Sequence, residues 1–528
     1  MEKLLADILQ GIDYTATREL SGITLRLVTT DSRKVERGSL FVCVQGLVAD
    51  GHNFIAVAVA QGAIAIVANR ERKEDLNSLT IPVVWVEDTR KTIGDLASAF
   101  YDHPSAALTM IGLTGTNGKT TTSFILESII LAAGGVPGVI GTINYRYGGR
   151  EFPARFTTPE PVELQCLLRE MSDHGVTHVI MEVSSHALAM HRIRGISFDS
   201  ALFTNLTRDH LDFHTDMEAY YQAKKLLFTE YLRNGGTAVI LADDAEPGGT
   251  QWGRRLQNDI KSLGQGRTLS LITCGIENDC DIVAKDCTFS VGQTTATLTA
   301  MRRALPIHSN LVGAFNLKNI LGAVGVAMGL GLEPGVIALG LTTEIRVPGR
   351  LETVTGEDNP AGHPTVFVDY AHTPDALQNV LLTLRQLNPN RLIVVFGCGG
   401  DRDPGKRQMM GEIAGRLADI AIITADNSRS ESTEAIMAQI EQGVVTAGKN
   451  PLDRREASPS GYAAISNRGE AIAMAIALAQ DRDIVLLSGK GHENYQISAT
   501  GTIFFDDRLE AAKCLRHKNT PARPRDDA

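Results

Sequence analysis

A short glycine-rich turn, Gly115-Thr116-Asn117-Gly118-Lys119-Thr120, stands between an apolar run and a helical pattern. Leu108 to Leu113 predicts a buried strand, and Thr121 to Leu131 has the apolar spacing of a helix. This order places the turn at a helix N-terminus, where free backbone N–H groups and the helix dipole bind anions. We therefore predict a phosphate-binding loop for ATP or GTP, in which Lys119 reaches the outer phosphates and the Thr120 hydroxyl binds Mg²⁺.

The turn is shorter than the general phosphate loop, because only Thr116 and Asn117 separate Gly115 from Gly118. An ordinary turn is the alternative interpretation. The order of strand, turn and helix favours the phosphate loop, with Thr121 as the last residue expected to contact the nucleotide.

At 528 residues the chain is too long for one hydrophobic core and predicts about three domains. Its formal net charge of -10 disfavours a nucleic-acid binder or a polybasic membrane anchor, because either needs a basic face. Seven cysteines without a C-x-x-C pair indicate neither a disulfide framework nor a zinc site. Residues 1–10 lack the basic and apolar regions of a signal peptide, and no apolar run is long enough to span a membrane. We expect a soluble, cytoplasmic monomer that binds neither nucleic acid nor membrane.

Strand and helix patterns divide the chain into three predicted α/β domains. Residues 1–104 predict a small α/β domain, and a proline at its end favours a linker. Residues 105–346 alternate strands and helices, including a helix over Met217 to Leu232 and a strand over Thr237 to Ala242, which predicts a parallel sheet wrapped by helices. Residues 347–516 repeat the alternation and predict a Rossmann-like, doubly wound domain. Residues 517–528, rich in Pro, Arg and Asp, are expected to be disordered.

Polar residues follow the predicted strand Thr177 to Glu182. Glu182 ends this strand, where a parallel sheet presents side chains to a ligand, and its carboxylate suits Mg²⁺. An acidic residue that faces water is the alternative. The Ser184 hydroxyl suits phosphate or sugar oxygens, or a helix N-cap.

A second polar cluster, Thr204 to Asp212, follows the next predicted strand. His210 is a candidate metal ligand or phosphate donor, although a lone histidine is more often structural. Lys224 and Lys225 follow on a predicted helix, where adjacent lysines are usually two solvated charges.

Six motifs stand in the order found in the Mur ligases, the ATP-dependent amide-forming enzymes of peptidoglycan assembly, and the chain resembles them over nearly its whole length. These motifs are Gly115 to Thr120, Glu182-Val183-Ser184-Ser185-His186, Thr204 to Asp212, Gly313-Ala314-Phe315-Asn316, Pro348-Gly349-Arg350-Leu351-Glu352 and Asp369-Tyr370-Ala371-His372-Thr373-Pro374. The resemblance implies a small N-terminal uridine-nucleotide domain, a central ATPase domain and a C-terminal domain for the incoming amino acid.

The resemblance also implies roles for single residues. In these ligases a lysine on the helix after the second polar cluster is carbamylated and helps to hold Mg²⁺, and by alignment Lys224 rather than Lys225 matches it. The implied catalytic residues are Lys119, Glu182, His210 and Lys224, and the implied metal ligands are Thr120, Glu182, His210 and carbamylated Lys224. Further ATP contacts are implied for Asn316, Arg350 and Asp369 across a domain junction.

Within the family the resemblance is closest to the members that add meso-diaminopimelate to UDP-N-acetylmuramoyl-L-alanyl-D-glutamate (UDP-MurNAc-L-Ala-D-Glu). Contacts with this nucleotide dipeptide are implied for Thr30, Ser32, Thr157, Thr158, Ser184, Met190 and Arg192. Met190 departs from the glutamine of some relatives.

Meso-diaminopimelate carries two ammonium and two carboxylate groups, so its pocket needs both signs of charge. Arg402 and Arg429 suit the carboxylates, because a guanidinium donates two parallel hydrogen bonds, and Asp426 and Glu493 can accept from ammonium groups. Salt bridges between strand ends are the alternative interpretation. The full predicted pocket is Arg402, Asp426, Asn427, Ser428, Arg429, Gly489 and Glu493, with Ser428 in place of the family's proline.

We therefore expect an ATP-dependent ligase that works through an acyl phosphate. A lysine-adding Mur ligase or a folylpolyglutamate synthetase would share the phosphate loop but differ around Asp426 to Arg429. A non-enzymatic ATP switch would have no use for an amino-acid pocket.

Overall fold

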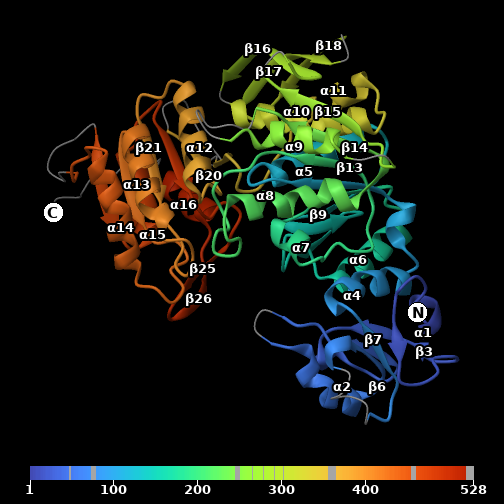
Figure 1. The fold of residues 1–528 in the computed structure, drawn as a ribbon. Coiled ribbons are helices and arrows are strands. Elements are labelled where there is room, and N and C mark those ends of the chain that lie inside the picture. The colour runs from blue at the N-terminus through green and yellow to red at the C-terminus, as the bar shows by residue number, and fades with distance from the viewer. Residues whose placement is uncertain are drawn as a thin grey trace.

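The computed structural model describes residues 1–46, 49–72, 79–243, 250–263, 266–276, 279–290, 292–300, 303–354, 364–452 and 460–518. Three sheet-centred units follow one another along the chain, and the central unit adjoins both of the others (Figure 1). Within these ranges no helix is long and apolar enough to cross a membrane.

The N-terminal unit is a five-stranded sheet in the order β2-β7-β6-β5-β4, parallel except at the edge strand β2. Its strands are β2 (Thr15–Ala16), β4 (Leu27–Thr29), β5 (Ser39–Val42), β6 (Ala63–Asn69) and β7 (Val83–Val86), beside the pair β1 (Lys3–Leu4) and β3 (Thr24–Leu25). Its α-helices are α1 (Leu5–Ile8), α2 (Ile55–Gln61) and α4 (Thr89–Phe100). The Asp88 carboxylate caps α4 by accepting from the backbone N–H groups of Arg90 and Lys91.

The central unit is an eleven-stranded sheet in the order β11-β10-β9-β12-β8-β13-β14-β15-β16-β17-β18. Strands β9 to β16 of this order pair in parallel, and antiparallel strands extend both edges. The strands are β8 (Thr109–Thr114), β9 (Pro137–Ile140), β10 (Asn144–Tyr147), β11 (Arg150–Pro153), β12 (His178–Glu182), β13 (Phe198–Phe203), β14 (Leu232–Leu241), β15 (Ser270–Gly275), β16 (Ile282–Ser290), β17 (Gln293–Ala300) and β18 (Arg303–Ser309). The helices are α5 (Lys119–Ala132), α6 (Pro161–Asp173), α7 (Ser185–Ala189), α8 (Met217–Leu226), α9 (Trp252–Lys261), α10 (Ala314–Gly329) and α11 (Pro334–Thr342).

Strand β8 is buried on both faces, which explains its continuous apolar sequence. Ile111 and Leu113 pack into a core with residues of α5 and α10, whereas Met110 packs into a second core with residues of α6 and of the segment after α8. The phosphate-loop strand is therefore held rigidly in the middle of the sheet.

The C-terminal unit is a six-stranded sheet in the order β19-β20-β24-β21-β22-β23, parallel except for β19. Its strands are β19 (Glu352–Val354), β20 (Thr365–Asp369), β21 (Leu392–Phe396), β22 (Ile420–Thr424), β23 (Gly461–Ile465) and β24 (Ile484–Ser488), followed by the hairpin β25 (Tyr495–Ser498) and β26 (Gly501–Phe504). Its helices are α12 (Pro374–Gln386), α13 (Gly405–Leu417), α14 (Thr433–Thr446), α15 (Arg468–Leu478) and α16 (Asp507–Lys518). Apolar cores cover both faces of this sheet, as expected for a doubly wound domain.

Helix α8, strand β14 and helix α16 differ from the sequence-based expectation. The helix predicted over Met217 to Leu232 ends at Leu226, a π-helical turn follows at Leu227–Tyr231, and β14 begins at Leu232 rather than at Thr237. Leu232 pairs with Phe198 of β13 and is buried, so pairing with the sheet outweighs continuation of the helix. Helix α16 continues to Lys518, two residues into the predicted tail 517–528, and residues 519–528 lie outside the described residues.

Candidate active site

The glycine-rich turn joins β8 to the N-terminus of α5, as predicted, and two of its glycines have positive φ angles. Gly115 has φ +147°, and a Cβ there would lie 1.9 Å from the Thr204 hydroxyl oxygen. Gly118, with φ +90°, is the N-cap of α5, and a Cβ there would lie 2.3 Å from the Asn319 side-chain oxygen. Both positions therefore require glycine.

The second polar cluster braces this turn from behind. The Thr116 backbone N–H donates to the Asn205 carbonyl oxygen at 3.0 Å, and the Asn117 N–H donates to the Asn205 side-chain oxygen at 2.9 Å. The Thr204 hydroxyl donates to the Asn117 carbonyl oxygen at 2.6 Å. The turn is thus fixed in shape before any ligand binds.

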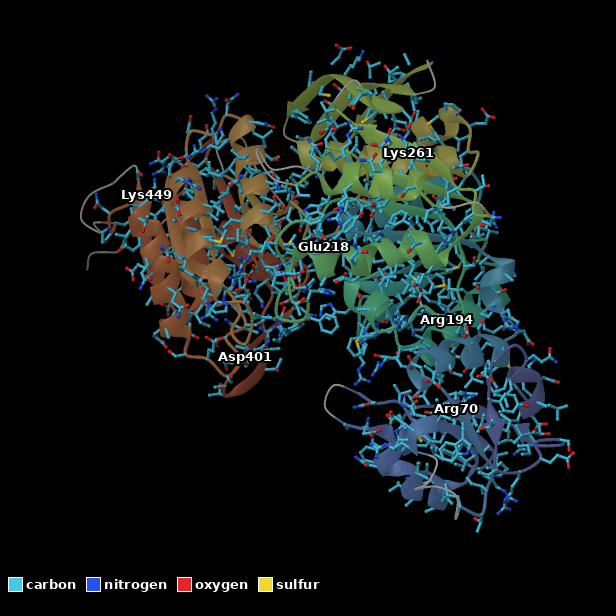
Figure 2. All side chains as sticks on the ribbon, viewed as in Figure 1. Arg70, Arg194, Glu218, Lys261, Asp401 and Lys449 are labelled. Carbon is cyan, nitrogen blue, oxygen red and sulfur yellow. The ribbon has the colours of Figure 1, made fainter. Side chains whose placement is uncertain are left out.

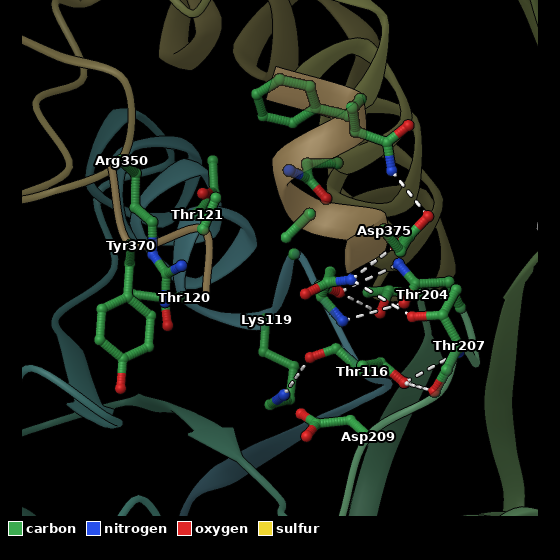
Figure 3. Close-up of a pocket in the computed structure, with 18 of the residues that line it drawn as sticks. Thr116, Lys119, Thr120, Thr121, Thr204, Thr207, Asp209, Arg350, Tyr370 and Asp375 are labelled. Atoms are coloured by element: carbon green, nitrogen blue, oxygen red, sulfur yellow. Dashed lines mark hydrogen bonds between the residues drawn. The ribbon is translucent and has the colours of Figure 1, made fainter. Parts of the chain in front are cut away.

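A cavity of about 450 Å³ opens in front of the turn, between the central and C-terminal units (Figure 3). The central unit lines it with Thr116 to Thr120 of the turn, and Arg350, Tyr370 and Asp375 line it from the C-terminal side. Further lining residues are Thr121, Thr142, Thr157, Glu182, Ser184, Thr204, Asn205, Asp209, His210, Lys318, Asn319, Asp369 and His372.

Glu182 and Thr120 meet on the cavity wall. The Thr120 hydroxyl donates to Glu182 Oε2 at 3.0 Å, and Glu182 is 1% exposed at the end of β12. Thr142 also donates to this carboxylate, from its backbone N–H at 3.1 Å and its hydroxyl at 2.9 Å. A buried carboxylate beside a hydroxyl supplies the hard oxygen ligands that Mg²⁺ prefers.

Two lysines converge on one oxygen of the turn. Lys119 Nζ donates to the Gly115 carbonyl oxygen at 2.9 Å, and Lys224 Nζ donates to the same oxygen at 2.8 Å. Desolvation lowers the pKa of Lys119, against the attraction of Glu182. Burial, together with the positive charge of Lys119, lowers the pKa of Lys224 well below its usual range. Lys225, by contrast, points away and pairs with Asp259 at 2.9 Å.

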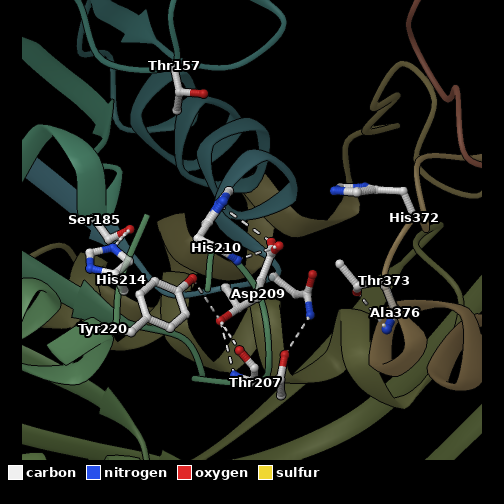
Figure 4. Close-up of polar contacts among 12 residues, drawn as sticks. Thr157, Ser185, Thr207, Asp209, His210, His214, Tyr220, His372, Thr373 and Ala376 are labelled. Carbon is white, nitrogen blue, oxygen red and sulfur yellow. Dashed lines mark hydrogen bonds and ion pairs between the residues drawn. The ribbon is translucent and has the colours of Figure 1, made fainter. Parts of the chain in front are cut away.

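His210 lies near Asp209, and His214 lies near Tyr220 (Figure 4). The positive charges of Lys119 and Lys224 act on His210. The His210 ring is 4.9 Å from that of His186, and desolvation within the cavity wall lowers the pKa of His210 to about 4. His210 Nε2 is 3.5 Å from Asp209 Oδ2. His214 is buried and shares a hydrogen bond with the Ser185 hydroxyl at 2.9 Å. Within the described residues, no group of three His, Cys, Asp or Glu side chains is arranged to bind a metal by itself.

Tyr370 connects the cavity to the residues of the C-terminal unit that the sequence predicts as the amino-acid pocket. The Arg350 guanidinium lies over its ring at 4.6 Å, and its hydroxyl donates to Glu493 Oε1 at 3.5 Å. Next to it, the Asp369 carboxylate accepts from the backbone N–H groups of Leu351 at 2.7 Å and Ala371 at 2.8 Å. Burial raises the pKa of Asp369, while Arg350 opposes the shift.

The predicted amino-acid pocket gathers charged residues at the ends of β22 and β24. Asp426 and Asn427 follow β22, and Lys490 and Glu493 follow β24. The Asn427 side-chain N–H donates to Glu493 Oε2 at 2.8 Å, and the Lys490 ammonium lies 3.4 Å from the same oxygen. Arg429 has φ +51° and donates from Nη1 to the Gly400 carbonyl oxygen at 2.8 Å.

Comparison with known proteins identifies the family. Residues 113–327 match the Mur ligase middle domain, residues 349–491 match the Mur ligase glutamate ligase domain, and residues 24–101 match the Mur ligase family catalytic domain. A Geobacter metallireducens protein named UDP-N-acetylmuramoyl-L-alanyl-D-glutamate--2,6-diaminopimelate ligase is 44% identical over 497 residues, which cover 92% of this chain and 93% of that protein. The chain belongs to the Mur ligase family.

Two further relatives of this Mur ligase carry the same name. A Geobacter sulfurreducens protein is 42% identical over 532 residues, covering 98% of this chain and 99% of that protein. A solved structure of a ligase with this name superposes with a TM-score of 0.67 at 30% identity, covering 95% of this chain and 97% of the other. The predicted three-domain α/β fold agrees with that structure.

Some predicted site residues of this Mur ligase do not line the cavity. Asn316 is buried behind its wall, where its side-chain N–H donates to the Val312 carbonyl oxygen at 2.9 Å. Asn319, one helical turn further along α10, reaches the phosphate loop instead. Lys224 also lies behind the turn, 1% exposed.

The residues predicted to bind the nucleotide dipeptide fall into two groups. Thr157 and Ser184 line the cavity, and the Thr158 hydroxyl donates to the Glu182 carbonyl oxygen at 2.8 Å behind them. Arg192 pairs with Glu160 at 2.9 Å, and one of its side-chain N–H groups lies 3.8 Å from the Met190 sulfur. The other group is Thr30 and Ser32, which lie on the N-terminal unit after β4.

Arg402 lies apart from the pocket around Asp426. It is exposed beside Asp401, and it lines a separate hollow with Arg208 and Asp212 of the central unit. Figure 2 places Asp401 at the end of the C-terminal unit that carries the β25–β26 hairpin.

Several residues that shape the site were not predicted individually. Asn205, Asn319, Tyr370 and Lys490 all contact predicted site residues. Asn205, Tyr370 and Lys490 stand inside recognised motifs, which was the available signal, whereas only the folded α10 shows that Asn319 faces the loop.

Proposed function

We propose that this Mur ligase is an ATP-dependent amide ligase that joins meso-diaminopimelate to the D-glutamate carboxylate of UDP-MurNAc-L-Ala-D-Glu during cytoplasmic synthesis of peptidoglycan precursors. The observation that carries the proposal is the position of Tyr370, between a cavity walled by a phosphate loop and a buried cluster of side chains with both signs of charge. High identity to ligases named for this reaction supports it.

In the proposed reaction, the terminal D-glutamate carboxylate attacks the γ-phosphorus of ATP, and ADP leaves. The neutral amine of the amino acid then attacks the acyl phosphate, and the tetrahedral intermediate expels phosphate while the nitrogen loses a proton. Phosphorylation replaces a poor leaving group, oxide, by a good one. Lys119 and the N-terminus of α5 would bind the phosphates and orient the γ-phosphoryl group.

Thr120 and Glu182 fit a magnesium ion bound to the nucleotide, because a buried carboxylate stands 3.0 Å from a hydroxyl on the phosphate-loop helix. His210 would lie at the edge of such a site, on the same cavity wall. Bound Mg²⁺ would neutralise charge that gathers between ATP and the carboxylate.

Carbamylation of Lys224 is part of the proposal. The neutral amine would form an N–C bond with CO₂ and lose a proton, giving an anion in place of a cation. Its buried position and lowered pKa favour the neutral amine that this reaction needs.

We further propose that residues 1–104 bind the uridine nucleotide, with Thr30 and Ser32 as contacts, and that residues 105–346 bind ATP. The muramoyl dipeptide would pass Thr157, Thr158, Ser184, Met190 and Arg192 to reach the cavity. Residues 347–516 would bind the amino acid.

The test is phosphate release from ATP by the purified protein. Release should require Mg²⁺, UDP-MurNAc-L-Ala-D-Glu and an amino acid together, and meso-diaminopimelate should be preferred over lysine. Release without the amino acid would indicate an ATP switch, and a preference for lysine or glutamate would indicate a different ligase of this fold.

A further inference from the structure

Lys490 is the most deeply buried charged residue of the amino-acid pocket. It is 0% exposed, and its Nζ lies 3.3 Å from Asn427 Oδ1, 3.4 Å from Glu493 Oε2 and 3.7 Å from Asp426 Oδ1. Since it has no surface toward solvent or ligand, it acts through these neighbours rather than by touching a substrate.

The three neighbours form one connected set. Asn427 accepts from Lys490 and from the Ile497 backbone N–H at 3.0 Å, and it donates to Glu493 at 2.8 Å. Asp426 Oδ1 is buried and has no hydrogen-bond partner. Such an acceptor is costly unless a ligand donor completes it.

The charges of this set do not cancel. Asp426 and Glu493 are two carboxylates, and Lys490 is the one cation that contacts both among the described residues. Arg468 lies close enough to influence both carboxylates, but Asp507 pairs with it at 2.6 Å. The remaining titratable neighbours of Glu493 are the phenols Tyr370 and Tyr495.

We propose that Lys490 is a positioning residue for the incoming amino acid: it keeps the Glu493 carboxylate ionised beside the buried carboxylate of Asp426, so that Glu493 can accept from a ligand ammonium. The inference deepens the proposed function and rests on it, because the ammonium is that of the incoming diamino acid. The exposed face of Asp426, Asn427 and Glu493 makes the contact, and Lys490 holds Glu493 ionised from behind.

Loss of Lys490 should make amino-acid binding pH-dependent. Burial and Asp426 already raise the pKa of Glu493, and Lys490 opposes this rise. Without Lys490, the rise in the pKa of Glu493 that burial and Asp426 cause is no longer opposed, so the uncharged form of Glu493 persists to a higher pH. Since the folded-state pKa is raised, the carboxylate returns only as the pH increases through that pKa.

The experiment measures KM and kcat for meso-diaminopimelate between pH 6.5 and about 9 in the full-length enzyme. Lys490→Met should raise KM roughly tenfold to a hundredfold at neutral pH with a smaller change in kcat, and the ratio of its KM to that of the wild type should fall as the pH rises. Lys449→Met is the matched control, because Lys449 bonds the Asp419 carbonyl oxygen beyond the opposite end of β22. An unchanged KM, or a ratio independent of pH, would overturn the proposal.

A second comparison remains decisive if Lys490→Met does not fold. Glu493→Gln removes the carboxylate through which Lys490 acts. Adding Lys490→Met to Glu493→Gln should therefore leave KM within about twofold of that of Glu493→Gln alone. A further rise of about tenfold would show that Lys490 acts as a structural support and not through Glu493. If the wild type releases no phosphate with meso-diaminopimelate, the proposed function fails; an active wild type together with that further rise overturns the role of Lys490 alone.

Discussion

The carbonyl oxygen of Gly115 accepts hydrogen bonds from two lysines, and this single contact organises the centre of the site. Lys119 and Lys224 approach it at 2.9 and 2.8 Å, and both have a lowered pKa. A nearby anion would favour the charged form of each lysine. A bound phosphate can be this anion for Lys119. Lys224 can instead become an anion itself by carbamylation.

Replacement of Lys119 by alanine should abolish phosphate release and amide formation, with a loss of ~100-fold or more. The reason is that the charge on the transferring phosphoryl group would lose its closest cation. The measurement is coupled detection of ADP and phosphate at saturating substrates. A thermal melt close to that of the wild type would show that the fold is intact, and retained turnover would contradict the assignment of the loop.

Lys224 and its neighbour Lys225 offer a matched pair for the carbamate. With ¹³C-labelled bicarbonate, the wild type and Lys225→Ala should show a carbamate carbon resonance that Lys224→Ala lacks. Lys225→Ala should keep most activity, because Lys225 pairs with Asp259 away from the cavity. A resonance that disappears in Lys225→Ala instead would reverse the choice between the two lysines.

Arg429 tests amino-acid specificity. Arg429→Ala should reduce the preference for meso-diaminopimelate over lysine by ~10-fold or more, because only the former offers a distal carboxylate to a guanidinium. The measurement is kcat/KM for both amino acids. Arg416→Ala, which removes an exposed arginine paired with Glu412 on α13, is the control. An unchanged preference in Arg429→Ala would exclude Arg429 from the pocket.

At the scale of elements, the junction of β8 and α5 depends on glycine. Gly115→Ala should prevent ATP binding, because its Cβ would lie 3.1 Å from the Asn205 backbone and 1.9 Å from the Thr204 hydroxyl, whose bond to the Asn117 carbonyl oxygen shapes the turn. Calorimetric titration with a non-hydrolysable ATP analogue measures the effect. Gly335→Ala on α11, where a Cβ meets nothing within 4 Å, should bind the analogue as the wild type does. Normal binding by Gly115→Ala would mean that the turn does not hold the phosphates.

Elements with a strong apolar pattern could be predicted from the sequence. Elements held in place by residues distant in the sequence could not. The strand predicted over Thr177 to Glu182 is β12 (His178–Glu182), because its apolar centre, Val179 to Met181, is buried in the sheet. The β25–β26 hairpin is absent from the prediction, since Tyr495–Ser498 is no more apolar than a loop. Its first strand is held by pocket residues such as Asn427, which only the fold brings together.

The residues of the site also divide into those that could be predicted from the sequence and those that only the fold reveals. Glu182, Thr120 and His210 could be placed near the phosphate loop because they follow strand ends of one parallel sheet or lie in the loop itself. Asn316 and Asn319 could not be distinguished, because both belong to α10 and its packing alone decides which side chain faces Gly118. Sequence motifs name the segments of a site more readily than the side chains that line it.

At the scale of the whole molecule, the central and C-terminal units meet through polar contacts and through Phe315 of α10, which packs against the apolar core of the C-terminal unit. The Asn117 side chain on the phosphate loop donates to Asp375 of α12 at 2.9 Å, and Arg208 pairs with Asp403 at 3.4 Å. Polar, partly exposed contacts of this kind are weak and can be exchanged. The junction is therefore suited to movement when substrates bind.

Binding of a non-hydrolysable ATP analogue with UDP-MurNAc-L-Ala-D-Glu should draw the C-terminal unit closer to the other two. Small-angle X-ray scattering should show a smaller radius of gyration than for the free protein. Asn117→Ala should reduce this change, because it removes the bond between the phosphate loop and α12. An identical radius with and without ligands would indicate a junction that does not move.

Tyr370 couples the binding of the nucleotide to the binding of the amino acid. Tyr370 supports Arg350 with its ring and reaches Glu493 with its hydroxyl, so the nucleotide side and the amino-acid side share one side chain. Occupation of one pocket changes the environment of the other, and the two substrates should bind cooperatively rather than independently. An inhibitor that fills only the amino-acid pocket would then gain or lose potency with the cell's supply of ATP.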